Sequence, residues 1–314
     1  MSVAEPAGSE PPSGTARTLR APVPVDLATT LWPLQRGTGD PCHIGTPDGA
    51  IWRASRVRTG PVSYRLTQRA RDEIGCRAWG PGAEEFVETL PELFCLDEDL
   101  SGFAPTEPKV ADAHRRFPGL RMLRTGRVFE TLVPTILEQK VHGIAARRSW
   151  RLLVRRYGEP APGPVPPGLT VPPAAAAWRM VPSWVFHQAG VGPERSRAIV
   201  AAARVADRFD QPGCPPSEIQ RRLSAVPGIG PWTVAEVSQR ALGDADAVSV
   251  GDFHLAAMIG WTLAGRPFDD GEMLQHLAPL RPHRYRAIRL LVVGGHAVKP
   301  KFGPRTAVTD HSWH

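Results

Sequence analysis

The sequence predicts an α+β fold in which a small N-terminal antiparallel sheet domain packs against a larger, mainly helical domain. Two patterns carry this prediction. From about residue 26 to 96, short segments alternate apolar with polar residues and are separated by Gly- and Asp-containing turns, as in half-buried strands. Beyond Pro108 the apolar residues recur with the period of amphipathic helices. At 314 residues the chain is long enough to bury more than one core.

The N-terminal third is expected to hold a tail and the sheet domain. Residues 1–24 are dominated by Ala, Pro, Gly, Ser and Glu, with almost no large apolar side chain. Such a segment buries too little surface to order itself, so we expect a disordered tail. The sheet domain is expected over residues 25–108, with one helix near 83–90. Its expected strands are LWPLQR, AIWRASRV, PVSYRLTQRA and GCRAWG.

The helical domain is expected over residues 109–314. Strong helical periods cover 129–141, 145–157, 193–209, 216–225, 231–242, 253–263 and 285–293. A Pro-rich stretch at 160–173 interrupts these helices. Because proline fixes φ and lacks a backbone N–H, we expect this stretch to be a surface connector.

Composition excludes several classes of protein. The four cysteines include no C-x-x-C pair, so neither a zinc site nor an iron–sulfur cluster has its ligand spacing, and we expect no metal and no other cofactor. No apolar run approaches the roughly 20 residues that span a bilayer, and no leader segment opens the chain. We therefore expect no membrane partner and a cytoplasmic, nucleoid-associated location.

Charge is distributed unevenly along the chain. Residues 1–113 carry 11 Lys+Arg against 16 Asp+Glu, whereas residues 114–314 carry 27 against 15. A positive field concentrates polyanions, so this asymmetry favours a nucleic-acid partner. Genomic base composition is an alternative source of the basicity, because arginine outnumbers lysine 34 to 4. Several basic positions beyond residue 113 are candidate contacts to the DNA backbone: Arg115, Arg116, Arg121, Arg124, Arg127, His283, Arg284 and Arg286.

The most informative segment is residues 223–255, LSAVPGIGPWTVAEVSQRALGDADAVSVGDFHL. Its PGIG phrase lies between two helical patterns, where glycines let the backbone turn sharply and approach another surface closely. Pro231 then occupies the first position of the second helix, where proline is preferred. We expect a helix-hairpin-helix over residues 216–242 whose backbone N–H groups bind one DNA phosphate. The expected contact residues are Pro227, Gly228, Ile229 and Gly230. The alternative is a plain turn between packed helices.

This hairpin resembles the helix-hairpin-helix of the DNA glycosylase superfamily, in which a Gly- and Pro-rich hairpin is followed by an aspartate at a fixed distance. Asp252 stands 22 residues after Gly230. Residues 26 to about 305 also fit the plan of the 3-methyladenine DNA glycosylase II branch, including an I-L-x-Q phrase at 136–139. The resemblance implies a monofunctional glycosylase that flips alkylated purines, such as 3-methyladenine, out of duplex DNA and hydrolyses their glycosidic bond in base-excision repair.

The resemblance also implies roles for individual residues. Asp252 is the implied catalytic carboxylate, because a fixed anion beside C1′ stabilises the positive charge that develops on the sugar. An aspartate before an apolar helix is also a common helix cap, which is the alternative. Trp232 stands where strand-nicking relatives carry a Schiff-base lysine, so no lyase activity is expected.

The implied base pocket contains Trp232, Gln139 and Glu236, and a flipped base needs a wedge to fill the opened stack, for which Lys140 or Val141 is the candidate. Core packing is the alternative for Trp232, and an ion pair with an arginine is the alternative for Glu236.

Two other functions fit the same residues: a non-catalytic helix-hairpin-helix protein that binds damaged DNA, and a glycosylase for deaminated or oxidised purines. The expected partner in each case is double-stranded DNA containing damaged bases. A monomer is expected.

Overall fold

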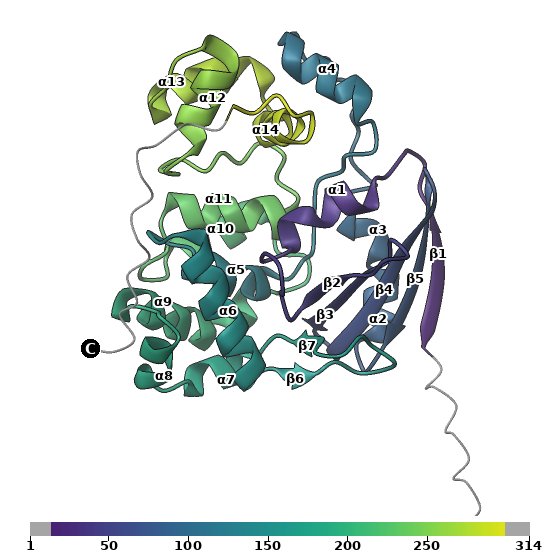
Figure 1. The fold of residues 1–314 in the computed structure, drawn as a ribbon, viewed down its shortest axis with the longest axis vertical. Helices are drawn as coiled ribbons and strands as arrows, with labels where there is room; N and C mark the ends of the chain where they lie inside the picture. Colours follow the sequence, from purple (N-terminus) through teal and green to yellow (C-terminus); the bar gives the residue numbers. More distant parts are fainter. Residues whose placement is uncertain (1–13, 299–314) are drawn as a thin grey trace, which may run out of the picture.

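The computed structural model describes residues 14–298 and contains one main sheet beside a large helical region (Figure 1). The sheet is antiparallel in every pairing and has the strand order β1-β5-β4-β3-β2. Its strands are β1 (Thr15–Arg20), β2 (His43–Gly45), β3 (Ile51–Val57), β4 (Gly60–Ala70) and β5 (Glu73–Trp79). Helix α2 (Ala83–Glu88) packs on β1, β4 and β5. The predicted α+β fold is thus confirmed.

The expected disordered tail is wrong in its second half. Strand β1 lies inside it, because Thr15–Arg20 pairs along its whole length with β5 and Leu19 is buried. This edge strand, TARTLR, contains one large apolar residue, Leu19, so the composition of the segment does not reveal it. Residues 1–13 of the expected tail lie outside the described residues.

The segment LWPLQR, expected as a strand, is helical. It ends helix α1 (Leu27–Leu31) and forms the 3-10 helix η1 (Trp32–Leu34). The Asp26 side chain accepts a hydrogen bond from the backbone N–H of Thr29, so it caps the start of α1. Leu27, Leu31 and Leu34 are all buried, and their spacing of four and three residues places them on one helical face.

Each of the seven predicted helical segments contains a helix, but the one predicted over 129–141 ends at Leu137. The remaining elements are mostly helices. They are α3 (Leu90–Leu93), α4 (Pro108–Arg116), α5 (Val128–Leu137), α6 (Gly143–Tyr157), β6 (Glu159–Pro160), β7 (Thr170–Val171), α7 (Ala175–Met180), α8 (Ser183–Gln188), α9 (Pro193–Arg204), η2 (Ala206–Arg208), α10 (Pro216–Ser224), α11 (Pro231–Val237), the π-helix η3 (Ser238–Leu242), α12 (Leu255–Ala264), α13 (Asp270–Leu277), η4 (Ala278–Leu280) and α14 (Arg284–Val293). Among the described residues, no helix is long and apolar enough to cross a membrane.

The helices bury two separate apolar cores. The hairpin core joins buried side chains between Val128 and Ala241, from α5 through η3, with Cys42. The C-terminal core joins side chains of 95–122 to side chains of 248–291. In Figure 1 its helices, α4 and α12 to α14, lie together on one side of α11. The expected helical domain therefore contains two cores, and the second includes Cys95 and Phe103 from before the expected boundary at residue 108.

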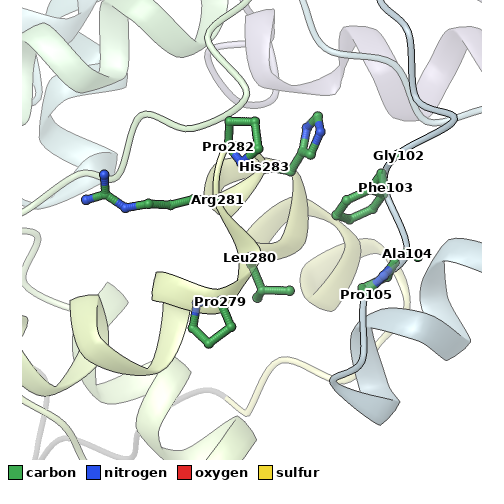
Figure 2. A pocket seen from close by; sticks show the side chains of 9 residues that line it. All are labelled: Gly102, Phe103, Ala104, Pro105, Pro279, Leu280, Arg281, Pro282 and His283. Carbon is green, nitrogen blue, oxygen red and sulfur yellow. The ribbon is translucent and has the colours of Figure 1, made fainter.

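Two hollows border the C-terminal core. One, of about 230 Å³, lies between residues 102–105 and 279–283, where the Phe103 and His283 rings meet edge to face at 4.8 Å (Figure 2). The other, of about 330 Å³, is lined by polar groups of Asp244, Asp246 and Arg284 among apolar side chains. Arg284 closes its polar side by pairing with both carboxylate oxygens of Asp246, at 2.8 and 2.7 Å.

The Pro-rich connector is more than the surface link that was expected. Its ends form the short ladder β6-β7, and β7 packs against β3 and β4 of the main sheet. Leu169 and Val171 are buried with Ala54 in a small cluster of their own. The Ser63 hydroxyl also donates a hydrogen bond to the Pro162 carbonyl. The connector therefore covers part of the sheet that α2 leaves open.

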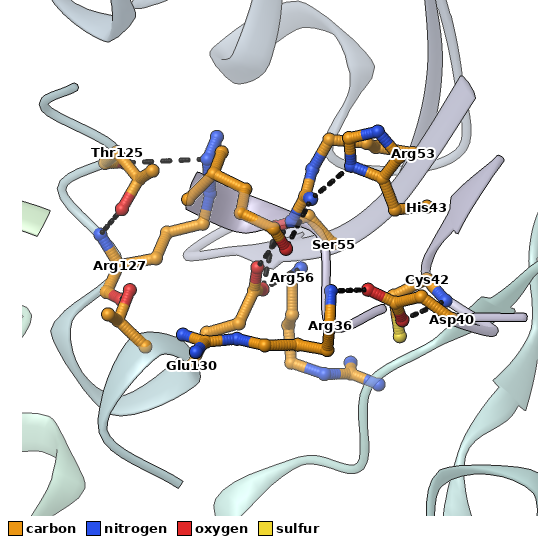
Figure 3. A network of polar contacts seen from close by, with 12 residues as sticks. Arg36, Asp40, Cys42, His43, Arg53, Ser55, Arg56, Thr125, Arg127 and Glu130 are labelled. Carbon is orange, nitrogen blue, oxygen red and sulfur yellow. Dashed lines mark hydrogen bonds and ion pairs between the residues drawn. The ribbon is translucent and has the colours of Figure 1, made fainter. Parts of the chain in front are cut away.

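A buried polar network joins the sheet to the hairpin core (Figure 3). Glu130 of α5 accepts hydrogen bonds from the Ser55 hydroxyl at 2.6 Å and from the Arg56 backbone N–H at 3.0 Å. The Arg53 guanidinium lies 3.9 Å from Glu130 and contacts the His43 ring nitrogen at 2.9 Å. Burial, and then the Arg53 charge, lower the pKa of His43 to about 3. The neutral imidazole can therefore accept from Arg53.

Candidate active site: a glycine hairpin beside a capped carboxylate

The predicted helix-hairpin-helix is present over residues 216–242, as α10, the PGIG turn, α11 and η3. Gly228 adopts φ of +87°, and a Cβ on it would lie 3.0 Å from the Ala198 Cβ of α9. Both constraints favour glycine at this position. Gly230 needs no left-handed backbone, and a Cβ there would meet nothing within 4 Å. Its lack of a side chain therefore matters only to a partner that approaches the hairpin from outside.

The four predicted contact residues of the hairpin differ in exposure. Ile229 is buried in the hairpin core and its N–H donates to the Val226 carbonyl at 3.1 Å, so this N–H is engaged, and the DNA contact by Ile229 stays a prediction. Pro227 and both glycines are exposed. Within residues 14–298, no hydrogen bond engages the N–H of Gly228 or of Gly230. These two N–H groups are therefore available to an anion.

Asp252 is half-buried and both of its carboxylate oxygens are engaged. Oδ1 accepts from the backbone N–H of His254 at 2.8 Å and of Leu255 at 2.9 Å, at the start of α12. Oδ2 accepts from the indole N–H of Trp232 at 3.1 Å. The helix-cap alternative is thus correct for one oxygen. The other oxygen faces the hairpin, and three donors together fix the plane of the carboxylate.

Trp232 links the two helical cores at this point. It is the second residue of α11, is half-buried, and directs the N–H edge of its ring at the carboxylate that opens α12. It is absent from the side chains that form the hairpin core, so the packing alternative does not account for its position. Its role in holding a base stays a prediction.

The predicted DNA-probing segment is a loop rather than a helix end. Helix α5 ends at Leu137, and Lys140 adopts φ of +52°, which is unusual for a residue with a side chain. The Gln139 amide nitrogen donates to the Gly228 carbonyl at 3.0 Å and to the Thr233 hydroxyl at 2.8 Å. Gln139 therefore holds this loop on the hairpin, and its predicted contact with a base is untested. Lys140 is exposed and Val141 half-buried, so both stay candidates for the wedge.

Glu236 forms an internal ion pair, which is the alternative to its predicted place in the base pocket. Its carboxylate lies 2.8 Å from the Arg240 guanidinium, and both side chains are only 14% exposed. Burial alone would lower the pKa of Arg240, but attraction by Glu236, Tyr285 and Glu138 raises it above its ordinary value. The alternative for Glu236, an ion pair with an arginine, is thus present in the structure, and its place in the base pocket stays a prediction.

Sequence reasoning missed two buried polar residues beside this pair. Gln239 donates to the Ser249 hydroxyl at 2.9 Å and to the Ala247 carbonyl at 3.0 Å. The Ser249 hydroxyl donates to Glu236 at 2.5 Å. The available signal was that Ser238 and Gln239 interrupt an apolar helical face between Val237 and Ala241.

Three of the eight predicted basic contacts lie in the interior. Arg121, Arg127 and Arg286 are buried, and Arg286 pairs with Glu98. Exposed or half-exposed members of the set also have carboxylate partners: Arg115 and Arg116 with Asp112, Arg124 with Asp97, and Arg284 with Asp246. Neither of the two hollows is lined by Asp252 or Trp232. The candidate site therefore rests on the hairpin and the carboxylate beside it.

Comparison with known proteins adds a family context. No family model matches the chain. Over 260 residues the chain is 31% identical to the probable bifunctional transcriptional activator/DNA repair enzyme AlkA of Mycobacterium tuberculosis, an alignment that covers 78% of this chain and 50% of that protein. The chain thus spans about half the length of this relative.

Solved structures with the same fold cover nearly the whole chain. The 3-methyladenine DNA glycosylase from Archaeoglobus fulgidus superposes with a TM-score of 0.70 at 17% identity, over 89% of this chain and 98% of that one. MBOgg1, solved in complex with a low affinity DNA ligand, superposes with a TM-score of 0.69 at 18% identity, over 90% and 96% of the two chains. The whole described architecture is therefore shared with these proteins, and not the hairpin alone.

Proposed function

We propose that this chain is a member of the helix-hairpin-helix superfamily of DNA glycosylases and that it hydrolyses the glycosidic bond of alkylated purines such as 3-methyladenine in duplex DNA. The observation that carries the proposal is the 3.1 Å hydrogen bond from the Trp232 indole to Asp252. It sets a carboxylate of fixed orientation beside a hairpin with free backbone N–H groups. The names of the relatives, a DNA repair enzyme and a 3-methyladenine glycosylase, support this substrate class.

Binding would begin with the DNA backbone. The N–H groups of Gly228 and Gly230 would hold one phosphate without reading sequence. The target nucleotide must then leave the stack, which costs a few kcal/mol and less where the pair is already damaged. Lys140 or Val141, on the loop that Gln139 holds against the hairpin, would fill the gap. We propose that one copy of the chain suffices for these steps.

The chemistry needs one carboxylate and one water. The C1′–N bond breaks with its electron pair staying on the base, and the sugar becomes oxocarbenium-like. Asp252 stabilises that positive charge and orients a water, whose oxygen bonds to C1′ while its proton passes to the carboxylate or to solvent. A purine alkylated at N3 or N7 is already cationic, so it leaves as a neutral molecule. No separate general acid is required.

The reaction is proposed to stop at the abasic site. A glycosylase that also nicks the strand attacks C1′ with an amine, and an indole cannot supply one. The Trp232 N–H is moreover engaged by Asp252. Hydrolysis by water is the remaining route.

The test is release of free base from methylated duplex DNA by the wild type and by Asp252→Asn, followed by alkali treatment. The proposal expects free 3-methyladenine or 7-methylguanine, strand breaks only after alkali, and loss of most of this activity in the variant while DNA binding persists. Binding without base release by either protein would establish a non-catalytic damage-binding protein instead. Faster release of hypoxanthine than of methylated adenine would assign the enzyme to deaminated purines.

A further inference from the structure

The hairpin and Asp252, which together form the proposed active site, belong to different apolar cores. The hairpin and α11 pack in the hairpin core, whereas Val248 and Ala256, on either side of Asp252, pack in the C-terminal core. The connecting segment, residues 243–254, contains little regular structure. Apolar packing is non-directional, so burial within each core does not fix Asp252 relative to the hairpin. Directional bonds between the two cores are required.

We propose that Glu236, Gln239 and Ser249 are positioning residues that hold the Asp252 carboxylate at its working place beside the hairpin. The inference rests on the proposed function, because it gives these residues a purpose only if Asp252 acts on DNA. Ser249 contacts Asp252 through the backbone, Glu236 and Gln239 act on Ser249, and none of the three is proposed to contact DNA.

Ser249 is the centre of this arrangement. It is 2% exposed, and its hydroxyl donates to Glu236 at 2.5 Å and accepts from Gln239 at 2.9 Å. Its backbone carbonyl accepts the N–H of Asp252 at 3.2 Å. A serine hydroxyl offers one donor and two acceptor sites, so both of its side-chain bonds are compatible. The position of Ser249 is therefore transmitted directly to the residue three positions later.

Glu236, Gln239 and Ser249 are here called the clamp. Further bonds hold the part of the clamp that lies on α11 and η3. Gln239 and Arg240 stand three and four residues after Glu236, which are the spacings that place side chains on one helix face. Arg240 pairs with Glu236 and also donates from its Nε to the Pro33 carbonyl at 3.2 Å. Gln239 adds a second bond to the connecting segment, at the Ala247 carbonyl. The clamp is thus anchored on α11, on η3 and on the 3-10 helix η1 that follows α1.

A second, separate support reaches the same segment from the C-terminal core. The N–H of Gly251, which has φ of +84°, donates to the Asp270 carboxylate at the start of α13 at 2.9 Å. Asp252 is therefore held by its neighbours on both sides of the junction. On the hairpin side, the Ser249 bonds lie nearest to Asp252 along the backbone, and the Gln239 bond at Ala247 lies two residues further away.

The main experiment measures single-turnover base release and DNA affinity for Ser249→Ala. Misplacement of a catalytic group by about 1 Å costs up to about 100-fold in rate, so we expect a loss of about 10- to 100-fold with an unchanged Kd. Ser149→Ala is the matched control, because Ser149 is equally buried and donates to the Ala189 carbonyl at 2.6 Å, away from Asp252. The control is expected to keep the wild-type rate at a temperature where both variants are folded.

A double-mutant cycle separates positioning from general destabilisation. Ser249→Ala is combined with Asp252→Asn, and we expect less than about a twofold further loss in the double variant, because Ser249 acts only through the carboxylate. If Ser249→Ala folds poorly, Gln239→Ala tests the same clamp, because it removes the hydrogen bonds to Ser249 and Ala247. Glu236→Gln keeps an acceptor for Ser249, so it is expected to retain more activity than Glu236→Ala.

The outcomes are distinct. Strong, non-additive losses at Ser249 or Gln239, with an unaffected Ser149 control, support the inference. Additive losses, or losses no larger than that of Ser149→Ala, overturn it while leaving the proposed function intact. Absence of base release by the wild type itself overturns the proposed function and, with it, the role of the clamp.

Discussion

Glu130 should be essential for the junction between the sheet and the hairpin core, and Glu130→Ala tests this. Its carboxylate is 18% exposed and accepts from the Ser55 hydroxyl and the Arg56 N–H, with the Arg53 guanidinium 3.9 Å away. Alanine leaves the two donors without their acceptor and removes the carboxylate beside the buried Arg53 cation, which keeps its other hydrogen bonds. Leaving a buried donor unsatisfied costs about 1–3 kcal/mol, and breaking a buried ion pair by removing one partner costs about 3–5 kcal/mol. We expect a loss of about 3–5 kcal/mol.

The matched control is Glu159→Ala. Glu159 accepts from the side chain of the same Arg56 at 2.5 Å, but the two side chains are 52% and 27% exposed. A pair at that exposure contributes about 0–1 kcal/mol, since solvent screens it. The two variants therefore remove a carboxylate from the same arginine residue in buried and exposed settings.

Thermal unfolding followed by circular dichroism measures the difference. At about 2–4 °C per kcal/mol for chains of this size class, Glu130→Ala should lower Tm by roughly 6–20 °C, and Glu159→Ala by less than about 4 °C. Glu130→Gln, which keeps one acceptor oxygen, should lie between them. Equal shifts for the two alanine variants would refute the reasoning and show that the sheet is held on α5 by apolar contacts alone.

Three further predictions concern the hairpin, the site and pH. Gly228→Ala should lower stability by about 1–2 kcal/mol because of its left-handed φ and the contact behind it, whereas Gly230→Ala should leave Tm unchanged and weaken DNA binding; thermal shift and a binding titration compare them. Trp232→Phe removes the donor to Asp252 and should slow single-turnover base release about 3- to 30-fold, and an unchanged rate would count against the geometry. Burial raises the pKa of Asp210 to about 7, so between about pH 4 and 7 the unfolded chain loses a proton that the folded chain keeps, and stability falls with rising pH by up to about 4 kcal/mol. Asp210→Asn should remove this fall of stability with rising pH, so the variant should be more stable than wild type at pH 8 but not at pH 4. If the Tm values of variant and wild type change with pH in parallel, the prediction is contradicted.

The sequence was sufficient for the fold class and for the elements with a strong period. Strands β3 to β5 and the seven helical segments followed from apolar spacing, and PGIG with Pro231 predicted the hairpin. Local chemistry decides these features, because glycine allows backbone angles that other residues avoid and proline fixes φ wherever they stand. Asp252 was also found from the sequence, since its spacing from the hairpin fits a known pattern.

Features that depend on long-range contacts were not predicted. Strand β1 is ordered by pairing with β5, about 60 residues away, while its own composition resembles that of a tail. Glu236 was assigned to the pocket by the resemblance, with an ion pair to an arginine as the alternative. Arg240 lies within reach because it is four residues later, whereas only the fold brings Ser249 to the Glu236 carboxylate. The arginines of the C-terminal half illustrate the same limit, because a count of positive charge does not separate exposed arginines from those buried against Glu98 or Asp246.

The division into two helical cores explains why polar residues are buried around the site. A carboxylate that stabilises a developing charge must be oriented, and orientation requires hydrogen bonds rather than apolar contact. Four such bonds cross between α11 or η3 and residues 247–252, donated by Trp232, Ser249 and twice by Gln239. Each would be unfavourable to bury alone, but together every donor has an acceptor. The junction can therefore keep Asp252 in register with the hairpin while each core remains packed only within itself, and a substitution that tilts one core against the other should reduce base release before it reduces the stability of either.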